Sequence, residues 1–166
     1  MLGMRRGLVL ATVAGVVLFA ASACAGGQDE VLLGGEWGEV CMPAEADEQA
    51  GTGDMITAGA EDLTITDVQL VEATNLELHE ALVLPEEGAL GYAPYPPADL
   101  PGWSQRAEAA GTVVPAGTKV SLVVAVSRPS ADVDGFAKSL RVSYTAGEQT
   151  HERTNTTSIR VKTSCF

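Results

Sequence analysis

Residues 139–144 read SLRVSY and residues 158–162 read SIRVK, and both stretches alternate apolar with polar side chains. In the first stretch, Leu140, Val142 and Tyr144 therefore fall on one side of an extended chain. A repeat of two is the spacing of a strand with one buried and one wet face, whereas a helix repeats its apolar residues every three or four positions. The two stretches predict strands that pack one face on a core.

Further strands are predicted upstream of these two. Residues 120–126 (VSLVVAV) are almost wholly apolar and predict a central strand. Residues 63–71 form an apolar run whose phase slips near Thr66 and Asp67, which predicts a β-bulge. Residues 76–84 predict another strand, whose four leucines are expected to share one face: Leu76, Leu78, Leu82 and Leu84.

Turn-forming segments separate these strands. Residues 43–54 (PAEADEQAGTGD) are acidic and predict a loop, and residues 146–148 (AGE) predict a hairpin turn. One or two turns of helix are expected at residues 104–110. Short strands punctuated by turns, in a domain of this size, predict an all-β fold, an antiparallel β-sandwich that is immunoglobulin-like.

The N-terminal residues have the layout of a secretory signal. Arg5 and Arg6 supply positive charge, and residues 8–21 (LVLATVAGVVLFAA) form an uncharged apolar run that ends in small residues. This run is shorter than the roughly 20 residues that a membrane-spanning helix needs. We therefore expect residues 1–23 to be a signal peptide and exclude them from the fold.

The signal ends in Ala21-Ser22-Ala23-Cys24, which resembles the lipobox of bacterial lipoproteins. In that family the Cys becomes the first mature residue and carries the lipid. The family prefers Leu, Val or Ile at the position of Ala21, and the same tripeptide also fits the A-x-A pattern of ordinary signal cleavage. The resemblance implies that Cys24 is lipidated and holds the protein on the outer face of the cytoplasmic membrane.

The remaining chain is long enough for one domain. Residues 24–35 are Gly-rich and predict a lipidated tether, and residues 36–166 predict a single β-sandwich domain. This layout is similar to that of small uncharacterised lipoproteins from high-GC Gram-positive bacteria. The similarity implies a lipid anchor such as palmitate and a compact β-domain, and it implies no activity.

Three cysteines are present, Cys24, Cys41 and Cys165. An odd cysteine in a secreted protein requires an explanation, and a lipid on Cys24 leaves an even pair. The compartment outside the membrane permits disulfides, and the alternation of residues 158–162, if continued, places Cys165 on the buried face. We therefore predict a disulfide between Cys41 and Cys165; two separate thiols, or a bridge to Cys24, are the alternatives.

The charge is acidic and unevenly placed. The net charge is −12, and no Lys or Arg lies between Gly7 and Gln105, where 17 acids lie. Such a surface argues against nucleic acid as a partner and against electrostatic binding to anionic lipid. Either the acidic half forms a face for a cationic partner, or acidic N-terminal strands lie beside basic C-terminal strands and the two partly compensate.

No catalytic or cofactor motif is present. The sequence has no G-x-S-x-G elbow, no Gly-rich phosphate loop after a strand and no H-E-x-x-H. His79 and His151 have no Cys, His or Met partner at ligand spacing, so both are expected to be ordinary surface histidines. We therefore predict no cofactor, no metal and no enzymatic activity.

One segment has the composition of a recognition loop. Residues 88–104 (GALGYAPYPPADLPGWS) carry four prolines together with Tyr92, Tyr95 and Trp103. A connection of this length is either functional or disordered, and aromatic side chains supply contact area with a polar tip. The three aromatic residues are candidates for binding a protein or cell-envelope partner; the alternative is a loop that folds back to cover the sheet.

These observations predict a membrane-tethered, extracytoplasmic binding or interaction module without catalytic activity. The alternative is a carrier of a small ligand or cation that uses the acidic half of the chain.

Overall fold

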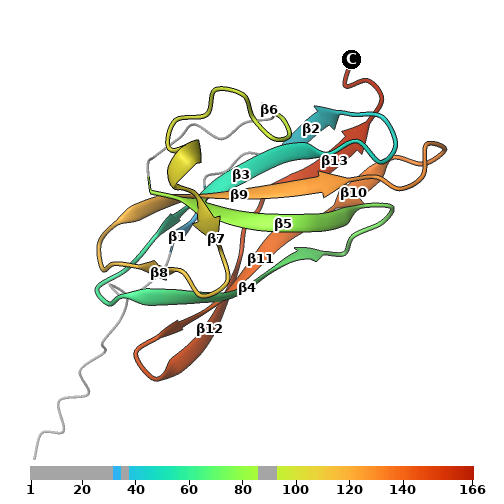
Figure 1. Cartoon of the computed structure of the whole chain (residues 1–166). Coiled ribbons are helices and arrows are strands. Elements are labelled where there is room, and N and C mark those ends of the chain that lie inside the picture. Colours follow the sequence, from blue (N-terminus) through green and yellow to red (C-terminus); the bar gives the residue numbers. More distant parts are fainter. Residues whose placement is uncertain (1–31, 35–37, 86–92) are drawn as a thin grey trace, which may run out of the picture.

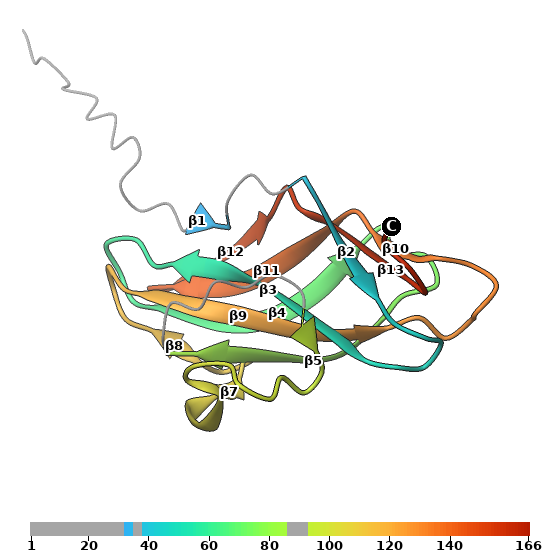
Figure 2. The ribbon, with the colours of Figure 1, turned by 90° about the horizontal axis from the view of Figure 1, so that it is seen from above.

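The computed structural model describes residues 32–34, 38–85 and 93–166, and these form two packed layers of β-strands (Figures 1 and 2). A single turn of 3-10 helix, η1 (Trp103–Gln105), interrupts the strands. The strands are β1 (Leu32–Leu33), β2 (Glu39–Pro43), β3 (Ala50–Thr57), β4 (Leu63–Val71), β5 (Glu77–Leu84), β6 (Ala93–Pro94), β7 (Ala107–Glu108), β8 (Val113–Val114), β9 (Lys119–Ser127), β10 (Gly135–Ala137), β11 (Ser139–Ala146), β12 (Gln149–Thr154) and β13 (Ser158–Lys162).

The order of the strands confirms the predicted immunoglobulin-like sandwich. One layer has the order β1-β3-β9-β5-β7, with β6 also beside β3. The other contains β12-β11-β4-β8 and, next to it, β10-β13-β2. When the strands are lettered in chain order, the sheet β1-β3-β9-β5 corresponds to the A-B-E-D sheet of an immunoglobulin domain. The sheet β4-β11-β12 corresponds to its C-F-G sheet. The pairing of β2 with β13 is parallel, and the other strand pairs are antiparallel.

Strand β9 lies at the centre of its sheet and is buried on both faces. Val120, Leu122, Val124 and Val126 point into the core between the layers. Val123 and Ala125 alternate with them on the outer face, yet they are 3% and 0% exposed. A strand covered on both sides needs no polar alternation, which explains the continuous apolar run in the sequence.

The predicted β-bulge in residues 63–71 is confirmed. On β11, Ser143 is opposite Asp67 and Tyr144 is opposite Ile65, so Thr66 is the extra residue of β4. The bulge keeps Ile65 and Val68 buried on the same side although they are three positions apart. An inserted residue of this kind accounts for the slip in the apolar phase.

The prediction that the four leucines of residues 76–84 share one face is wrong. Leu78 is opposite Val126 and Glu80 is opposite Ala125, so His79 is an unpaired, bulged residue. The bulge reverses the alternation downstream of it. Leu76 and Leu78 therefore pack on the core between the layers, while Leu82 and Leu84 are buried on the outer face of the sheet.

The loop predicted for residues 43–54 is shorter than expected, because β3 begins at Ala50. Ala50, Thr52, Asp54 and Ile56 are buried on the core face of β3. Gly51 and Gly53 alternate with them, and Gly51 pairs with Ala93 of β6. These small and polar residues have the composition of a turn. In the structure they belong to a strand that is covered on both faces, where small side chains fit.

Two smaller expectations also change. Of residues 104–110, only the end of η1 is helical, and Ala107–Glu108 form β7 instead. At the end of the expected tether, Leu32 and Leu33 form β1 and pair with Thr57 and Ile56 of β3.

Residues 1–31, including the expected signal peptide and Cys24, lie outside the described residues. In the described ranges, no helix has the length and hydropathy to cross a membrane.

The predicted disulfide between Cys41 and Cys165 is present, with a sequence separation of 124 residues. Cys41 lies within β2, and Cys165 follows the end of β13, which pairs with β2. Strand β13 ends at Lys162, so the strand alternation does not extend to Cys165 as expected. The bond instead fastens the C-terminal tail to the neighbouring edge strand.

Acidic and basic halves of the sequence meet across the sheets, as one of the two interpretations predicts. Arg160 of β13 donates to the carboxylate of Glu39 of β2 at 3.0 and 3.1 Å, which lowers the pKa of Glu39. Lys138 pairs with Glu72 at 2.6 Å. Contacts between neighbouring strands thus compensate part of the charge asymmetry.

Candidate functional site

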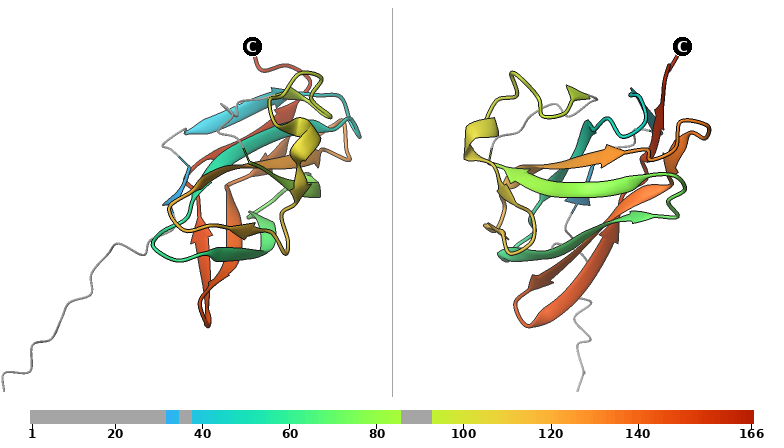
Figure 3. Two further views of the ribbon diagram at one scale, coloured as in Figure 1. Left: turned by 60° about the vertical axis from the view of Figure 1, so that its left-hand side comes forward. Right: turned by 45° about the vertical axis from the view of Figure 1, so that its right-hand side comes forward.

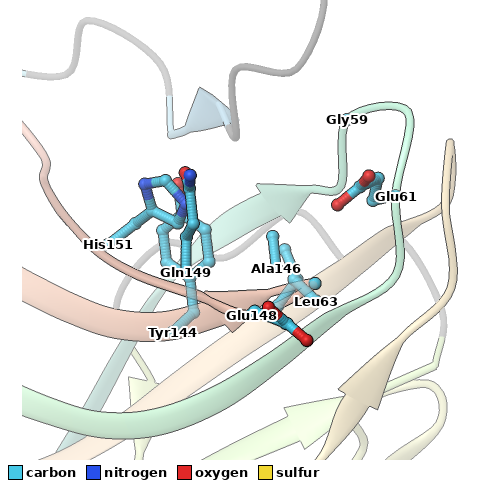
Figure 4. Close-up of a pocket in the computed structure, with 9 residues that line it drawn as sticks. Gly59, Glu61, Leu63, Tyr144, Ala146, Glu148, Gln149 and His151 are labelled. Atoms are coloured by element: carbon cyan, nitrogen blue, oxygen red, sulfur yellow. The ribbon is translucent and has the colours of Figure 1, made fainter.

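A pocket of about 420 Å³ opens at one end of the sandwich, between the turn after β3 and the β11–β12 hairpin (Figure 4). This volume lies within the range of roughly 300–1,000 Å³ that is usual for small-molecule sites. Leu63, Tyr144 and Ala146 form its floor, and polar side chains stand around them. The full lining is Gly59, Glu61, Leu63, Tyr144, Ala146, Gly147, Glu148, Gln149 and His151.

The register of the β11–β12 hairpin places one wall of the pocket. Tyr144 is opposite His151 and Ala146 is opposite Gln149, so these four side chains share one face of the hairpin. The rings of Tyr144 and His151 stack with centroids 5.3 Å apart and planes inclined by 22°. Tyr144 is buried, and His151 is half-buried and lies toward the pocket.

The opposite wall is the turn between β3 and β4, which carries Glu61. A Cβ atom on Gly147 would lie 3.1 Å from Oε2 of Glu61, so the two turns approach each other closely. Gly147 also has a φ of +57°, a left-handed conformation that glycine adopts without strain. Glycine at this position therefore lets the hairpin turn come up against the carboxylate of Glu61.

A buried polar network joins the two layers farther along β3. Nδ2 of Asn155 donates to Oδ2 of Asp54 at 2.8 Å, and Oδ1 of Asn155 accepts from the backbone N–H of Leu140 at 2.8 Å. Asp54 is 5% exposed, and its burial raises the pKa of its carboxyl group. The network fixes β3 relative to β11, and with them the two sides of the pocket.

The other candidate region, residues 93–106, crosses the outer face of the β3-β9-β5 layer (Figure 3). The segment starts on β3 through β6 and returns to β5 through β7. Tyr95 donates to Oε1 of Glu80 on β5, and burial together with this bond raises the pKa of the Tyr95 hydroxyl. Trp103 meets Tyr95 edge to face, with ring centroids 5.6 Å apart, and the guanidinium of Arg106 lies 4.6 Å from the Trp103 ring centroid.

This arrangement favours the interpretation of the segment as cover. Leu82, Leu84, Val123 and Ala125 all face outward from that layer and are nonetheless buried. Tyr92 lies outside the described residues. The structure brings Tyr95 and Trp103 together, but it directs Tyr95 toward the sheet rather than toward a partner.

We expect Trp103→Ala to lower the free energy of unfolding by about 1–3 kcal/mol, because Trp103 is half-buried and holds Tyr95 and Arg106 by ring contacts. Urea denaturation measures the change. The exposed Gln105→Ala serves as the neighbouring control and should leave stability nearly unchanged. Unaltered stability in Trp103→Ala would instead support a recognition role for the loop.

The pocket was not predicted from the sequence. His79 is exposed as expected, and its Nε2 lies 2.7 Å from Oγ of Ser127. His151 differs from the expectation, because it is part of the pocket wall. The sequence signal for this position is the spacing of two between Gln149 and His151, which places both on one face of a strand. The stacking on Tyr144 depends on a strand pairing that the sequence does not specify. Among the described residues, no group of three or more His, Cys, Asp or Glu is arranged to hold a metal.

Comparisons with known proteins give no family. No protein-family model and no curated protein matches the sequence. Among solved structures, the Vibrio cholerae VesB protease is similar at 9% identity and a TM-score of 0.42, over 81% of this chain and 32% of that one. A family 123 glycoside hydrolase from Clostridium perfringens is similar at 11% identity and a TM-score of 0.44, over 75% of this chain and 22% of that one. This chain therefore spans about a third and about a fifth of those two proteins.

Proposed function

We propose that the protein is an extracytoplasmic binding module, tethered to the membrane through a lipid on Cys24, and that it binds a small ligand in the pocket at the end of the sandwich. The pocket carries the proposal, because it combines an apolar floor with convergent polar groups, as small-molecule sites do. The ring pair of Tyr144 and His151 gives the site a defined wall. The absence of any catalytic motif from the sequence favours binding over catalysis.

The position of β1 supports the link between the tether and the pocket. Leu32 is opposite Thr57, two residues before Gly59 in the pocket lining. Cys24 precedes Leu32 by eight residues, and an extended chain spans at most about 3.6 Å per residue. A lipid on Cys24 would therefore keep the pocket end of the domain within about 30 Å of the membrane surface.

Filling the pocket tests the proposal. Ala146 lies on the pocket floor and is half-buried, so Ala146→Phe should occupy the space that a ligand would take. A fragment library screened by NMR against the full chain in a non-ionic detergent should shift the resonances of Gly59, Gly147 and His151. We expect the shifts to disappear in Ala146→Phe. The exposed Ala73→Phe is the matched control, because Ala73 lies outside the pocket lining.

If no fragment of any charge shifts these resonances in the wild-type protein, the pocket is not a ligand site. If Ala146→Phe leaves the shifts in place, the ligand lies elsewhere. Either outcome contradicts the proposal.

The tether gives a separate prediction. We expect the wild-type protein to partition into the detergent phase and its mature N-terminal peptide to carry the mass of a lipid at Cys24. Cys24→Ala should be released to the medium or remain uncleaved, because the residue that accepts the lipid is gone. Cys165→Ser, which lacks a different cysteine, should partition like the wild type. A wild-type mature N-terminus without lipid would refute the anchor.

A further inference from the structure

The pocket lining contains two carboxylate side chains. Glu61 and Glu148 stand on opposite turns at the rim, and neither Lys nor Arg is among the lining residues. Figure 4 shows the Glu61 side chain on the β3–β4 turn and the Glu148 side chain beside the floor. Two carboxylates in the lining of one cavity raise the local concentration of cations and disfavour anions.

Neither carboxylate is neutralised within the described part of the chain. The ion pairs of this part of the chain use other acids: Arg141 pairs with Glu152, Arg160 with Glu39 and Asp134, and Lys138 with Glu72. Arg153 lies on the same face of β12 as His151, at the next position on that face, and is outside the pocket lining. The negative charge of the rim is therefore available to a ligand.

The turn that carries Glu61 is anchored, although the Glu61 side chain itself is exposed. Its Oε2 lies so close to Gly147 that an added Cβ would come within 3.1 Å. Asp62, the next residue, accepts a hydrogen bond from the backbone N–H of Ala116 at 2.8 Å and so anchors the same turn. A carboxylate on an anchored turn loses less backbone freedom when it pairs with a ligand.

The floor adds a second requirement for the ligand. Leu63 and Ala146 supply apolar surface, and the stacked Tyr144 and His151 rings supply a flat wall. A hydrated metal ion would gain nothing from this surface, whereas an aliphatic body or a planar cation would displace water from it. Gln149 can both donate and accept a hydrogen bond at the same rim.

We propose that the pocket takes a small organic cation, an ammonium or guanidinium group on a short aliphatic body. The inference rests on the proposed function, since it names the ligand class of the same pocket. The charged group pairs with Glu61 and Glu148, and the aliphatic body lies over Leu63 and Ala146 against the ring pair. Affinity falls as salt is added, because the rim carboxylates are exposed and their attraction is screened.

The experiment compares cations with a neutral molecule of the same length. Putrescine and agmatine are titrated into the full chain in a non-ionic detergent, next to 1,4-butanediol, and the shifts of Gly59, Gly147 and His151 are followed by NMR. We expect both cations to bind and the diol to bind at least about tenfold more weakly, since charge-assisted hydrogen bonds are roughly twice as strong as neutral ones. Glu61→Gln with Glu148→Gln should weaken the cations by about tenfold or more.

Glu77→Gln is the control, because it removes the same charge from an exposed position on β5 outside the pocket lining. It should leave binding of both cations unchanged. Equal binding of the diol, or full affinity in the Glu61→Gln, Glu148→Gln variant, would overturn the inference. If neutral or anionic fragments shift the pocket residues while both cations do not, the ligand class is wrong and the proposed function stands. If no compound shifts the resonances of the pocket residues, both the ligand class and the proposed function are wrong.

Discussion

Replacing Cys165 with Ser is expected to lower the free energy of unfolding by about 3–5 kcal/mol, because the bond closes a loop of 124 residues. In the chain-entropy description, a loop of that length removes about 5 kcal/mol of freedom from the unfolded chain. The loss is comparable to the whole stability of a marginal domain, which is about 5 kcal/mol. Urea denaturation of the wild type and the variant measures it.

The matched variants are Cys41→Ser and the double variant. Because all three lack the same bond, all three should lose the same free energy, and the double should lose no more than either single. Cys165→Ser should also become more sensitive to protease. A loss below about 1 kcal/mol, or free thiols at both positions in protein taken from its native compartment, would show that the bond does not stabilise the domain.

The strands with regular alternation were predictable, because each has one buried and one wet face. Strands β11 and β13 follow the period of two, and the bulge at Thr66 is visible as a phase slip in residues 63–71. Strand β3 was not predictable in full. Its glycines and Asp54 have the composition of a turn, and only the cover by β6 and the bond to Asn155 make them compatible with a strand.

The outer face of the β3-β9-β5 layer shows why a face assignment from sequence fails. The leucines of residues 76–84 look like one stripe, but the bulged His79 divides them between the core and the outer face. No residue type marks that bulge in the sequence. Residues 93–106 cross this outer face, where Leu82 and Leu84 are buried, and Tyr95 among them donates to Glu80 of β5.

The disulfide was predictable from the cysteine count, whereas the pocket was not. Counting cysteines requires no knowledge of how the strands pair. The pocket, in contrast, depends on the strand register that sets Tyr144 opposite His151 and on the close approach of Glu61 to Gly147. Glu61 and Gly147 come from two turns that are far apart in the sequence. Nothing local in either turn indicates that they meet.

The second large effect is expected at Arg128, which directly follows β9 and is 1% exposed. Its Nε donates to the carbonyl of Ala44 at 3.2 Å, its Nη1 to that of Ala131 at 2.9 Å and its Nη2 to Oγ1 of Thr163 at 2.6 Å. Arg128→Met should cost about 3–5 kcal/mol, because the buried carbonyl of Ala44 loses its donor and the fully buried, well-packed site of the guanidinium is left partly empty. Lys138→Met, at an exposed ion pair, should cost less than about 1 kcal/mol.

Arg128 and the disulfide act on the same junction, so their effects should not add. Ala44 lies three residues after Cys41, and Thr163 lies two residues before Cys165, so the guanidinium and the S–S bond both hold β2 and the C-terminal tail together. In the double variant Arg128→Met, Cys165→Ser, the total loss should fall short of the sum by about 1–2 kcal/mol, since a tail released by one change has less to lose from the other. Strict additivity in urea denaturation would show that Arg128 stabilises the end of β9 on its own. In that case the bond to Thr163 contributes little, and Thr163→Val should then leave stability unchanged.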